Sequence, residues 1–480
     1  MTHMVELPYV LPHFKASSLG DVSIIAEHRF KCAIISVASK GDLKALRHLL
    51  NSASYVGTTL MPALVFKPPL HTDHMLTFIG DVHKIAKGSS MSLLLKAGSK
   101  GEAETLLKAF TSSRHLCHSL RNVAILWFDF FDGALSDEKI AKTALHLFNL
   151  VKPSHICLSV GIPFGDVEAS MKLLHECFGN AKFMIALRSE ADSRIECEAL
   201  RMCFPTSDQL KWFVYASALS GADGVIISDA CELLHRRIDL FKATAVVSAE
   251  AQVTSRYWRG IPLKDFQVEA RLQQALDATG QVESAKVHLC IHSPESNKLS
   301  EFLITALWWE LGKVSKLPDH SAKLFINICK GNMKEEFAHH YRAYMLRFPS
   351  PTRLRMRISG DELSVSVTGF DIVDCLLISS HLPSVEEIHI LMNSLAAPVM
   401  QFEVQMALNE YENAKRLLGL LPQDVAHRCR QALDVMGKCV SNMLMAARRR
   451  HIAKAIEHAK AFRRSYRGML NETITAKGSR

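Results

Sequence analysis

The sequence lacks the features that mark membrane-spanning, disulfide-stabilised and zinc-binding proteins. No apolar run reaches the roughly 18 residues that a transmembrane helix needs. The 12 cysteines include no Cys-x-x-Cys pair, and no set of four Cys and His residues has zinc-site spacing. Low-complexity segments and internal repeats are also missing. We therefore expect a globular protein of a reducing compartment, with its cysteines as small buried side chains and no bound metal or cofactor.

Positive charge is concentrated at the carboxyl end. The formal net charge is +9, and between Ala446 and Arg480 ten Lys or Arg stand against two Glu, so this segment carries almost all of it. The amino end, which reads MTHMVELPYVLPHFKASS, holds Glu6 and almost no basic residue. It is a poor mitochondrial presequence as it stands, although this test does not apply to a mature chain or an internal signal.

The first half of the chain alternates short apolar runs with amphipathic helical periods. Helices are expected over segments such as GDLKALRHLLNSA and DVEASMKLLHECFG. Strands are expected at 32–39, 58–66, 90–98, 123–131, 155–162, 182–189 and 223–230. Seven apolar strands in about 200 residues, each followed by a helix, are typical of a parallel (βα) barrel of the TIM type. We predict this α/β barrel over residues 29–265, preceded by an extension over residues 1–28.

The remaining chain has a different pattern. A smaller α/β domain is predicted over residues 266–383, with a helix over 298–314 and a hairpin that turns at Gly360-Asp361. Residues 384–480 are predicted to be a helical region that ends in the basic tail. Ser384 is the expected helix cap, with Glu387 as its capping-box partner.

The segment KFMIALRSEAD, from Lys182 to Asp192, ends a predicted barrel strand in charged residues. Catalytic groups of barrel enzymes lie at such strand ends. The longer segment SDEKIAKTALHLFNLVKPSHICLSVGIPFGDVEASMKLLHECFGNAKFMIALRS resembles the central part of the pyruvate kinase barrel, and PTSDQLKWFVYASALSGADGVIISDA is similar to a late segment of that family. The resemblance covers about 200 residues, by order and spacing more than by identity. It implies a TIM-type fold and phosphoryl transfer from phosphoenolpyruvate to ADP, with magnesium, potassium and a lysine.

The residues that the resemblance makes decisive differ from the family pattern. The family's catalytic lysine and, two residues later, its magnesium-binding glutamate correspond to Ala186 and Arg188. A guanidinium cannot ligate magnesium, so we expect Arg188 to form an ion pair or an anion contact. A potassium-binding aspartate falls near Lys96, and the phosphate and potassium residues of the second family strand correspond to Ala63, Val65 and Lys67. The nucleotide-lid domain and the Gly-Asp metal motif are also missing. The resemblance therefore implies a pseudoenzyme.

The basic tail is the strongest positive signal for a partner. On a helix its cations would form a basic surface, with Phe462 and Tyr466 available for stacking, which suits the phosphates of RNA. An acidic protein partner, a membrane-surface helix and a solvated helix end are the alternatives. The residues in question are Arg448, Arg449, Arg450, Lys454, Lys460, Arg463, Arg464 and Arg467.

Other motifs have simpler interpretations. The Gly-Asp-Val-His sequence with Asp81 and His83 lies within a helical period, so we expect a helix surface. Asp129 and Asp132 could bind a metal at a strand end, although an Asp-Gly turn explains them equally well. Trp308 and Trp309 are expected on the helix over 298–314, in the core or at a protein interface.

We thus predict a catalytically inactive, pyruvate-kinase-like subunit of a large assembly. The first hypothesis is a ribonucleoprotein of the mitochondrial matrix, with the cytoplasm as the alternative location. One alternative function is an enzyme of altered or residual phosphoryl-transfer chemistry, using Asp129, Asp132, Arg188 and Asp229. Another is a regulatory ligand-binding protein that uses the second domain.

Overall fold

The computed structural model divides the chain into two compact units. The barrel unit comprises Met1–Glu190 and Ser220–Arg237, and the second unit comprises Ala191–Leu219 and Ile238–Arg480. The residues that the structure describes are 7–20, 22–65, 72–85, 93–112, 123–129, 138–162, 166–179, 181–189, 198–201, 203–228, 230–263, 267–273, 287–294, 300–308, 322–329, 340–359 and 362–478.

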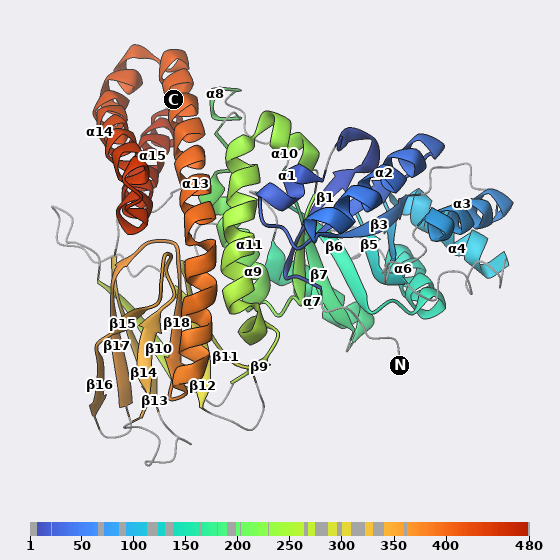
Figure 1. Cartoon of the computed structure of the whole chain (residues 1–480), viewed down its shortest axis with the longest axis horizontal. Coiled ribbons are helices and arrows are strands. Elements are labelled where there is room, and N and C mark those ends of the chain that lie inside the picture. Colours follow the sequence, from blue (N-terminus) through green and yellow to red (C-terminus); the bar gives the residue numbers. More distant parts are fainter. Residues whose placement is uncertain are drawn as a thin grey trace. The chain divides into compact units, whose positions relative to one another are not determined.

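The barrel unit is a closed barrel of eight parallel strands (Figure 1), so the TIM-type fold is confirmed. Its strands are β1 (Val10–Lys15), β2 (Cys32–Val37), β3 (Thr59–Val65), β4 (Leu93–Ala97), β5 (Val123–Phe128), β6 (His155–Ile162), β7 (Lys182–Ser189) and β8 (Gly224–Ile227). Its helices are α1 (Ser23–Glu27), α2 (Lys40–Val56), α3 (Thr72–Ile85), α4 (Lys100–Ser112), α6 (Glu138–Val151), α7 (Val167–Phe178) and α10 (Ala230–Arg236). All seven predicted strands are present as β2 to β8.

The eighth strand, β1, lies in the segment that we predicted to be an extension. It pairs with β2 on one side and with β8 on the other, and thereby closes the barrel. The boundary at residue 29 is therefore wrong, because the barrel needs Val10–Lys15. Pro12 and His13 interrupt the apolar pattern of this strand, and a proline within a short run argues against a strand interior.

The interior of the barrel is apolar and receives side chains from all eight strands. Side chains alternate between the two faces of a strand, so every second residue points inward. The buried interior cluster consists of Leu11, Cys32, Ile34, Met61, Ala63, Leu94, Ile125, Trp127, Cys157, Met184, Ala186 and Ile226. This cluster fixes which residues at the carboxyl end of each strand also face inward.

The second unit contains two sheets. The six-stranded sheet has the order β15 (Thr352–Leu354), β14 (Arg342–Met345), β18 (Val373–Ser379), β12 (Glu301–Trp308), β11 (Val287–Ser293), β9 (Ile261–Pro262). The four-stranded sheet has the order β10 (Gln267–Gln273), β13 (Ala322–Cys329), β17 (Glu362–Phe370), β16 (Met356–Ser359). The hairpin strands β16 and β17 pair as predicted, while their turn at Gly360-Asp361 lies outside the described residues.

The helix predicted over 298–314 is wrong, because Glu301–Trp308 forms the buried strand β12. A continuous apolar run has no periodicity that separates a buried strand from a buried helix. Trp308 is buried in the core, and its carbonyl oxygen accepts a hydrogen bond from Nε1 of Trp212 at 2.7 Å. Trp309 lies outside the described residues.

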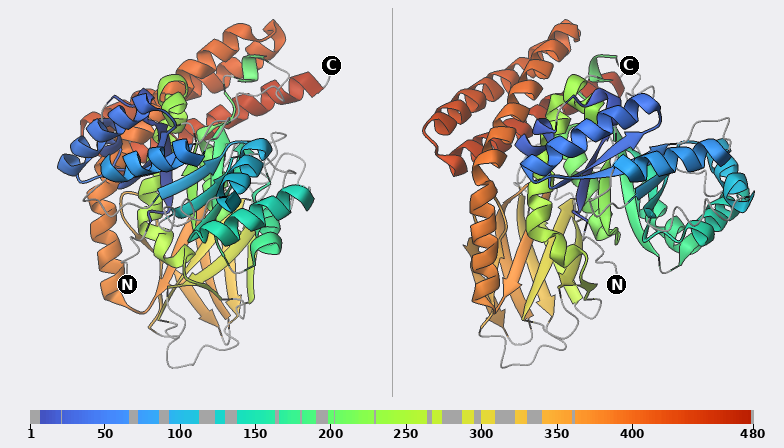
Figure 2. Two further views of the ribbon diagram at one scale, coloured as in Figure 1. Left: turned by 90° about the vertical axis from the view of Figure 1, so that its right-hand side faces the viewer. Right: turned by 45° about the vertical axis from the view of Figure 1, so that its right-hand side comes forward.

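Helices complete the second unit. Three short or medium helices, α8 (Glu198–Arg201), α9 (Ser207–Leu219) and α11 (Ile238–Trp258), precede the sheets. The helical region predicted from residue 384 onward is confirmed as α13 (Leu382–Leu420), α14 (Gln423–Arg448) and α15 (Ile452–Gly478). These three helices pack against one another and are orange to red in both views of Figure 2. No described helix is long and apolar enough to cross a membrane.

The predicted cap of this region is wrong. Helix α13 begins at Leu382 with His381 at the N-cap, so Ser384 lies within the first turn. Pro383 occupies that turn as well, where the fixed φ of proline favours a helix start. The Ser384 hydroxyl forms a hydrogen bond with Nδ1 of His381 at 2.8 Å instead of capping the helix.

Candidate functional site

Polar side chains gather at the carboxyl ends of the barrel strands, which we call the barrel mouth. The inward-facing residues of each strand continue from the apolar cluster by steps of two. They end at His13, Ser36, Val65, Lys96, Asp129, Ser159, Arg188 and Ser228. Seven of these eight positions are polar, so the barrel mouth differs chemically from the barrel interior.

Asp129, directly after β5, is at the centre of this group. Its Oδ2 lies 2.6 Å from Nζ of Lys96 on β4. Its Oδ1 lies 3.6 Å from Nη1 of Arg188 on β7. The side chains of Lys96 and Asp129 are only 13% and 11% exposed, whereas that of Arg188 is 31% exposed. The ion pair predicted for Arg188 is therefore confirmed.

A chain of hydrogen bonds holds the Asp129 carboxylate in place. Nε1 of Trp127 donates to Oγ of Ser159 at 2.9 Å, and the Ser159 hydroxyl donates to Oδ1 of Asp129 at 2.6 Å. The ammonium of Lys96 lies 4.0 Å from the centre of the Trp127 ring, which is cation–π geometry. Since Trp127 and Ser159 are fully buried, these contacts are shielded from water.

His13 connects this cluster to β1. Its Nε2 is 2.5 Å from Oγ of Ser36, and its ring meets the Trp127 ring edge-on at 4.9 Å. Burial, with a smaller contribution from the charges of Lys96 and Lys15, holds the pKa of His13 well below its ordinary value. His13 is therefore a neutral imidazole at physiological pH. Its Nδ1 has no hydrogen-bond partner among the described residues.

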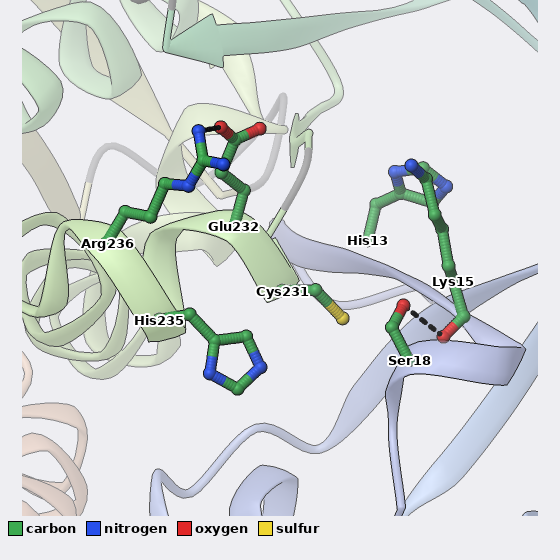
Figure 3. A pocket seen from close by; sticks show the side chains of 7 residues that line it. All are labelled: His13, Lys15, Ser18, Cys231, Glu232, His235 and Arg236. Carbon is green, nitrogen blue, oxygen red and sulfur yellow. Dashed lines mark hydrogen bonds and ion pairs between the residues drawn. The ribbon is translucent and has the colours of Figure 1, made fainter.

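A cavity of about 300 Å³ opens beside His13 at the carboxyl ends of β1 and β8 (Figure 3). One wall consists of His13, Lys15 and Ser18, and the other consists of α10 residues. The α10 residues are Cys231, Glu232, His235 and Arg236. Glu232 and Arg236 pair with each other at 2.9 Å. The cavity is within the size range of small-molecule sites and lies where barrel enzymes bind their ligands.

The positions implied by the pyruvate kinase resemblance separate into two groups. Ala63 and Ala186 are fully buried in the apolar barrel interior, whereas Lys96 and Arg188 lie at the barrel mouth. Val65 pairs with Lys96 across β3 and β4. The remaining candidates, Lys67, Asp132 and Asp229, lie outside the described residues. Among the residues described, no group of three or more His, Cys, Asp or Glu could hold a metal ion.

Three polar residues of the barrel mouth were not predicted from the sequence, namely His13, Ser36 and Ser159. Each follows an apolar interior residue by two positions on the same strand, namely Leu11, Ile34 and Cys157. Applying the period of two to each strand would have found Ser36 and Ser159. His13 could not be found without recognising β1.

The basic tail does not form one continuous basic surface, which corrects the prediction. Arg463 and Arg467 are buried in the second unit, where Arg463 pairs with Glu403, and Arg467 pairs with Asp208 and Asp371. The predicted stacking residues Phe462 and Tyr466 are also buried. The apolar face of α15 packs on α13 and α14, and these side chains lie on that face.

The rest of the tail differs in exposure. Arg448, Arg449, Arg450 and Lys454 are exposed around the turn between α14 and α15. Arg464 is half-buried, with Nη1 3.9 Å from Oδ2 of Asp371. Lys460 is half-buried beside a small cavity of the second unit.

The Asp81 motif lies on helix α3 as predicted, and Asp81 pairs with Lys84 at 3.5 Å.

No protein-family model and no curated protein sequence matches the chain. Among solved structures, an α-amylase from Anoxybacillus is similar over 75% of this chain and 88% of its own, with 9% identity and a TM-score of 0.42. An α-amylase from Geobacillus thermoleovorans and an α-L-fucosidase from Paenibacillus thiaminolyticus each cover 78% of this chain, at 8% identity and TM-scores of 0.39, over 99% and 100% of their own lengths. Similarity at this level carries no argument about activity.

Proposed function

We propose that this chain is a pyruvate-kinase-like barrel protein without phosphoryl-transfer activity, which serves as a structural subunit of a larger assembly. The observation that carries the proposal is that Asp129 at the barrel mouth pairs with two cations, Lys96 and Arg188, so that its negative charge is fully compensated. Ala186, at the position of the family's catalytic lysine, supports it because its side chain belongs to the buried interior cluster.

The charges of Lys96, Asp129 and Arg188 give a physical reason to expect that the barrel mouth does not bind magnesium and does not catalyse phosphoryl transfer. Magnesium is bound in proteins by oxygen ligands, mostly carboxylates and waters. Asp129 accepts a hydrogen bond from Ser159 and faces two cations, so its charge is already compensated. A divalent cation placed beside Lys96 and Arg188 would also be repelled by both.

An enzymatic assay tests the loss of catalysis. The purified chain, with phosphoenolpyruvate, ADP, magnesium and potassium, is expected to form no ATP above the uncatalysed background. An active pyruvate kinase serves as the positive control in the same buffer. Mn²⁺ electron paramagnetic resonance provides a second readout, and we expect no tight Mn²⁺ binding. Phosphoenolpyruvate-dependent ATP formation by the pure protein would contradict the proposal.

The exposed cations of the α14–α15 turn support a role in an assembly. Arg448, Arg449 and Arg450 are consecutive, and Lys454 follows within the first turn of α15. Such a compact group of exposed cations suits phosphates of a structured RNA, whose neutralisation dominates affinity. The first partner that we propose is therefore RNA within a ribonucleoprotein, through these four residues rather than through the whole tail.

A pull-down at low and high salt, with and without nuclease, tests this partner. We expect the association to disappear with nuclease and with simultaneous replacement of Arg448, Arg449 and Arg450 by Gln. The matched control replaces Arg353, Arg355 and Arg357 by Gln, because these three arginines are also exposed in the second unit. Association that survives nuclease would instead indicate a protein partner. Equal losses in both triple variants would indicate non-specific charge effects.

A second candidate function is the binding of a small anionic molecule at the barrel mouth. It is favoured by the cavity beside His13, because Lys15 lines this cavity and forms no ion pair with a described residue. Calorimetric titration with phosphoenolpyruvate and with inorganic phosphate tests this function. Lys15→Gln is expected to weaken binding about tenfold, whereas replacement of the exposed Lys44 by Gln should leave it unchanged. Binding that is insensitive to Lys15→Gln would place the ligand elsewhere.

A further inference from the structure

The second unit contains a small cavity surrounded by charged side chains from several of its elements. Its volume is about 30 Å³. Three cations line it, on α9, after β14 and on α15, and three carboxylates line it, on α11, β18 and α13. They are Lys211, Arg347 and Lys460, and Glu250, Asp374 and Glu403.

Every carboxylate of this cavity already has a cationic partner. Glu250 accepts from Nζ of Lys211 at 2.6 Å, and also from the hydroxyl of Tyr215 at 3.0 Å. Asp374 accepts from Nε of Arg347 at 2.7 Å. Glu403 pairs with Arg463, which lies outside the cavity lining. The negative charges around the cavity are therefore all compensated.

Lys460 is the remaining cation. Its ammonium makes no ion pair or hydrogen bond with any residue that the structure describes. Burial, followed by the charge of Arg347, lowers the pKa of Lys460 to about 8. Tyr215 and Cys375 also line the cavity, but burial raises the pKa of both, so neither supplies a negative charge.

We propose that this cavity binds a small monovalent anion of the size of chloride, with Lys460 as its counter-charge. A charge removed from water is costly unless it is paired, and here one negative charge is missing. The cavity volume of about 30 Å³ exceeds the roughly 10–15 Å³ that suffices to hold one water, so the cavity admits a monatomic ion.

The geometry also allows the anion to exchange with solvent. The Arg347 side chain, at the edge of the cavity, is 25% exposed.

All of the lining residues belong to the second unit, so this site is separate from the barrel mouth and does not depend on the proposed function. Because the anion binds only the folded cavity, it stabilises the second unit by mass action.

Thermal unfolding of the full chain tests this site. Unfolding is recorded in sodium chloride and in sodium gluconate at equal ionic strength, since gluconate is too large for the cavity. Chloride is expected to raise the melting temperature by about 2 °C or more. This difference should vanish in Lys460→Met, which removes the charge and keeps an apolar stem. It should persist in Lys438→Met, a matched change of an exposed lysine on the neighbouring helix α14.

Chloride-35 NMR on the unmodified protein decides the question even where Lys460→Met does not fold. We expect excess line broadening that falls as rising chloride fills the site and that bromide reverses by competition. Excess broadening that does not change with chloride concentration and that bromide does not reverse would show only diffuse screening and would overturn the proposal. Equal melting temperatures in chloride and gluconate would overturn it as well, as would a chloride effect that Lys460→Met retains.

Discussion

At the scale of single residues, the second unit contains a buried carboxyl group whose negative charge would be uncompensated. Glu410 on α13 is 1% exposed, and its Oε1 accepts a hydrogen bond from Ser207 at 2.5 Å. Its Oε2 has no hydrogen-bond partner among the described residues. Burial raises the pKa of Glu410 from 4.5 to about 8, which outweighs the opposite effect of Arg463. Glu410 is therefore protonated in the folded protein at neutral pH.

This shift predicts the direction of a pH effect on stability. Between pH 4.5 and about pH 8 the folded chain holds a proton at Glu410 that the unfolded chain has released. Stability from this group is complete at low pH and is lost as the pH rises through that window. Urea unfolding of Glu410→Gln should show a flatter decline and a higher free energy of unfolding above pH 8. Glu412→Gln, at an exposed position on the same helix, is the control; identical pH profiles for both variants would contradict the assignment.

Arg450 illustrates a second residue-scale effect. It follows the end of α14 with φ of 58°, the left-handed conformation that glycine adopts at helix ends. The amide groups of Arg450 and His451 donate to the carbonyls of Ala447 and Ala446, each at 2.9 Å, which is the Schellman pattern. An arginine is thus held where a side chain is unfavourable.

Arg450→Gly is expected to raise the free energy of unfolding by roughly 0.5–1 kcal/mol, because glycine needs no strain at this φ. Chemical denaturation measures the change. Arg449→Gly is the matched control, since Arg449 has an ordinary φ of −83° and should gain nothing. If Arg450→Gly also weakens the RNA association proposed above, then the charge at this position serves binding at a cost in stability.

At the scale of elements, α15 is attached to the second unit by buried arginines. The guanidinium of Arg467 is 1% exposed and pairs with Asp208 on α9 and with Asp371 between β17 and β18. Arg463 also lies 3.5 Å from Asp208 and pairs with Glu403 on α13. One helix therefore contacts three other elements through charges that are shielded from solvent.

Removing one partner from such a network leaves buried charges uncompensated. Arg467→Met should destabilise the second unit by about 3–5 kcal/mol, measured by urea unfolding. Arg449→Met changes an exposed arginine of the preceding turn and should stay within about 0.5 kcal/mol of the unmodified chain. A small effect of Arg467→Met would mean that solvent reaches Asp208 and Asp371 and that the network contributes little.

At the scale of the whole molecule, closure of the barrel depends on the strand that lies nearest the amino end. β1 supplies the only link between β2 and β8 among the described strands, through parallel pairing on both edges. Without it, two strand edges would lose their hydrogen-bond partners. His13 and Lys15 at the barrel mouth would be lost as well.

A variant that begins at Arg29 tests this dependence. We expect loss of the cooperative unfolding transition of the barrel unit and of the near-ultraviolet circular dichroism of the buried Trp127. A variant that begins at Leu7 retains β1 and should unfold like the full chain. A barrel transition that is preserved in the Arg29 variant would show that residues 10–15 are dispensable for closure.

Much of this fold could be predicted from local pattern. Seven barrel strands and the helical region after residue 384 were recognised, because apolar runs and helical periods arise from burial along a single element. β1 was missed because Pro12 and His13 interrupt its apolar pattern. β12 was predicted to be a helix because its eight residues are all buried and show no alternation. At the barrel mouth, Lys96, Arg188 and Asp129 were identified as notable residues, and the ion pair of Arg188 was expected.

The sequence alone determined the barrel class. That Ala186 and Arg188 stand where pyruvate-kinase-like chemistry would need other residues stays a prediction from the resemblance. The tertiary structure decided which charges meet. In this structure, Asp129 lies between Lys96 and Arg188. Arg463 and Arg467 are buried against carboxylates that are distant in the sequence, and Lys460 lies beside a cavity without a counter-charge. The physical reason is that hydrophobic periodicity is a local property of the chain, whereas the pairing and desolvation of charges depend on residues that only the folded structure brings together.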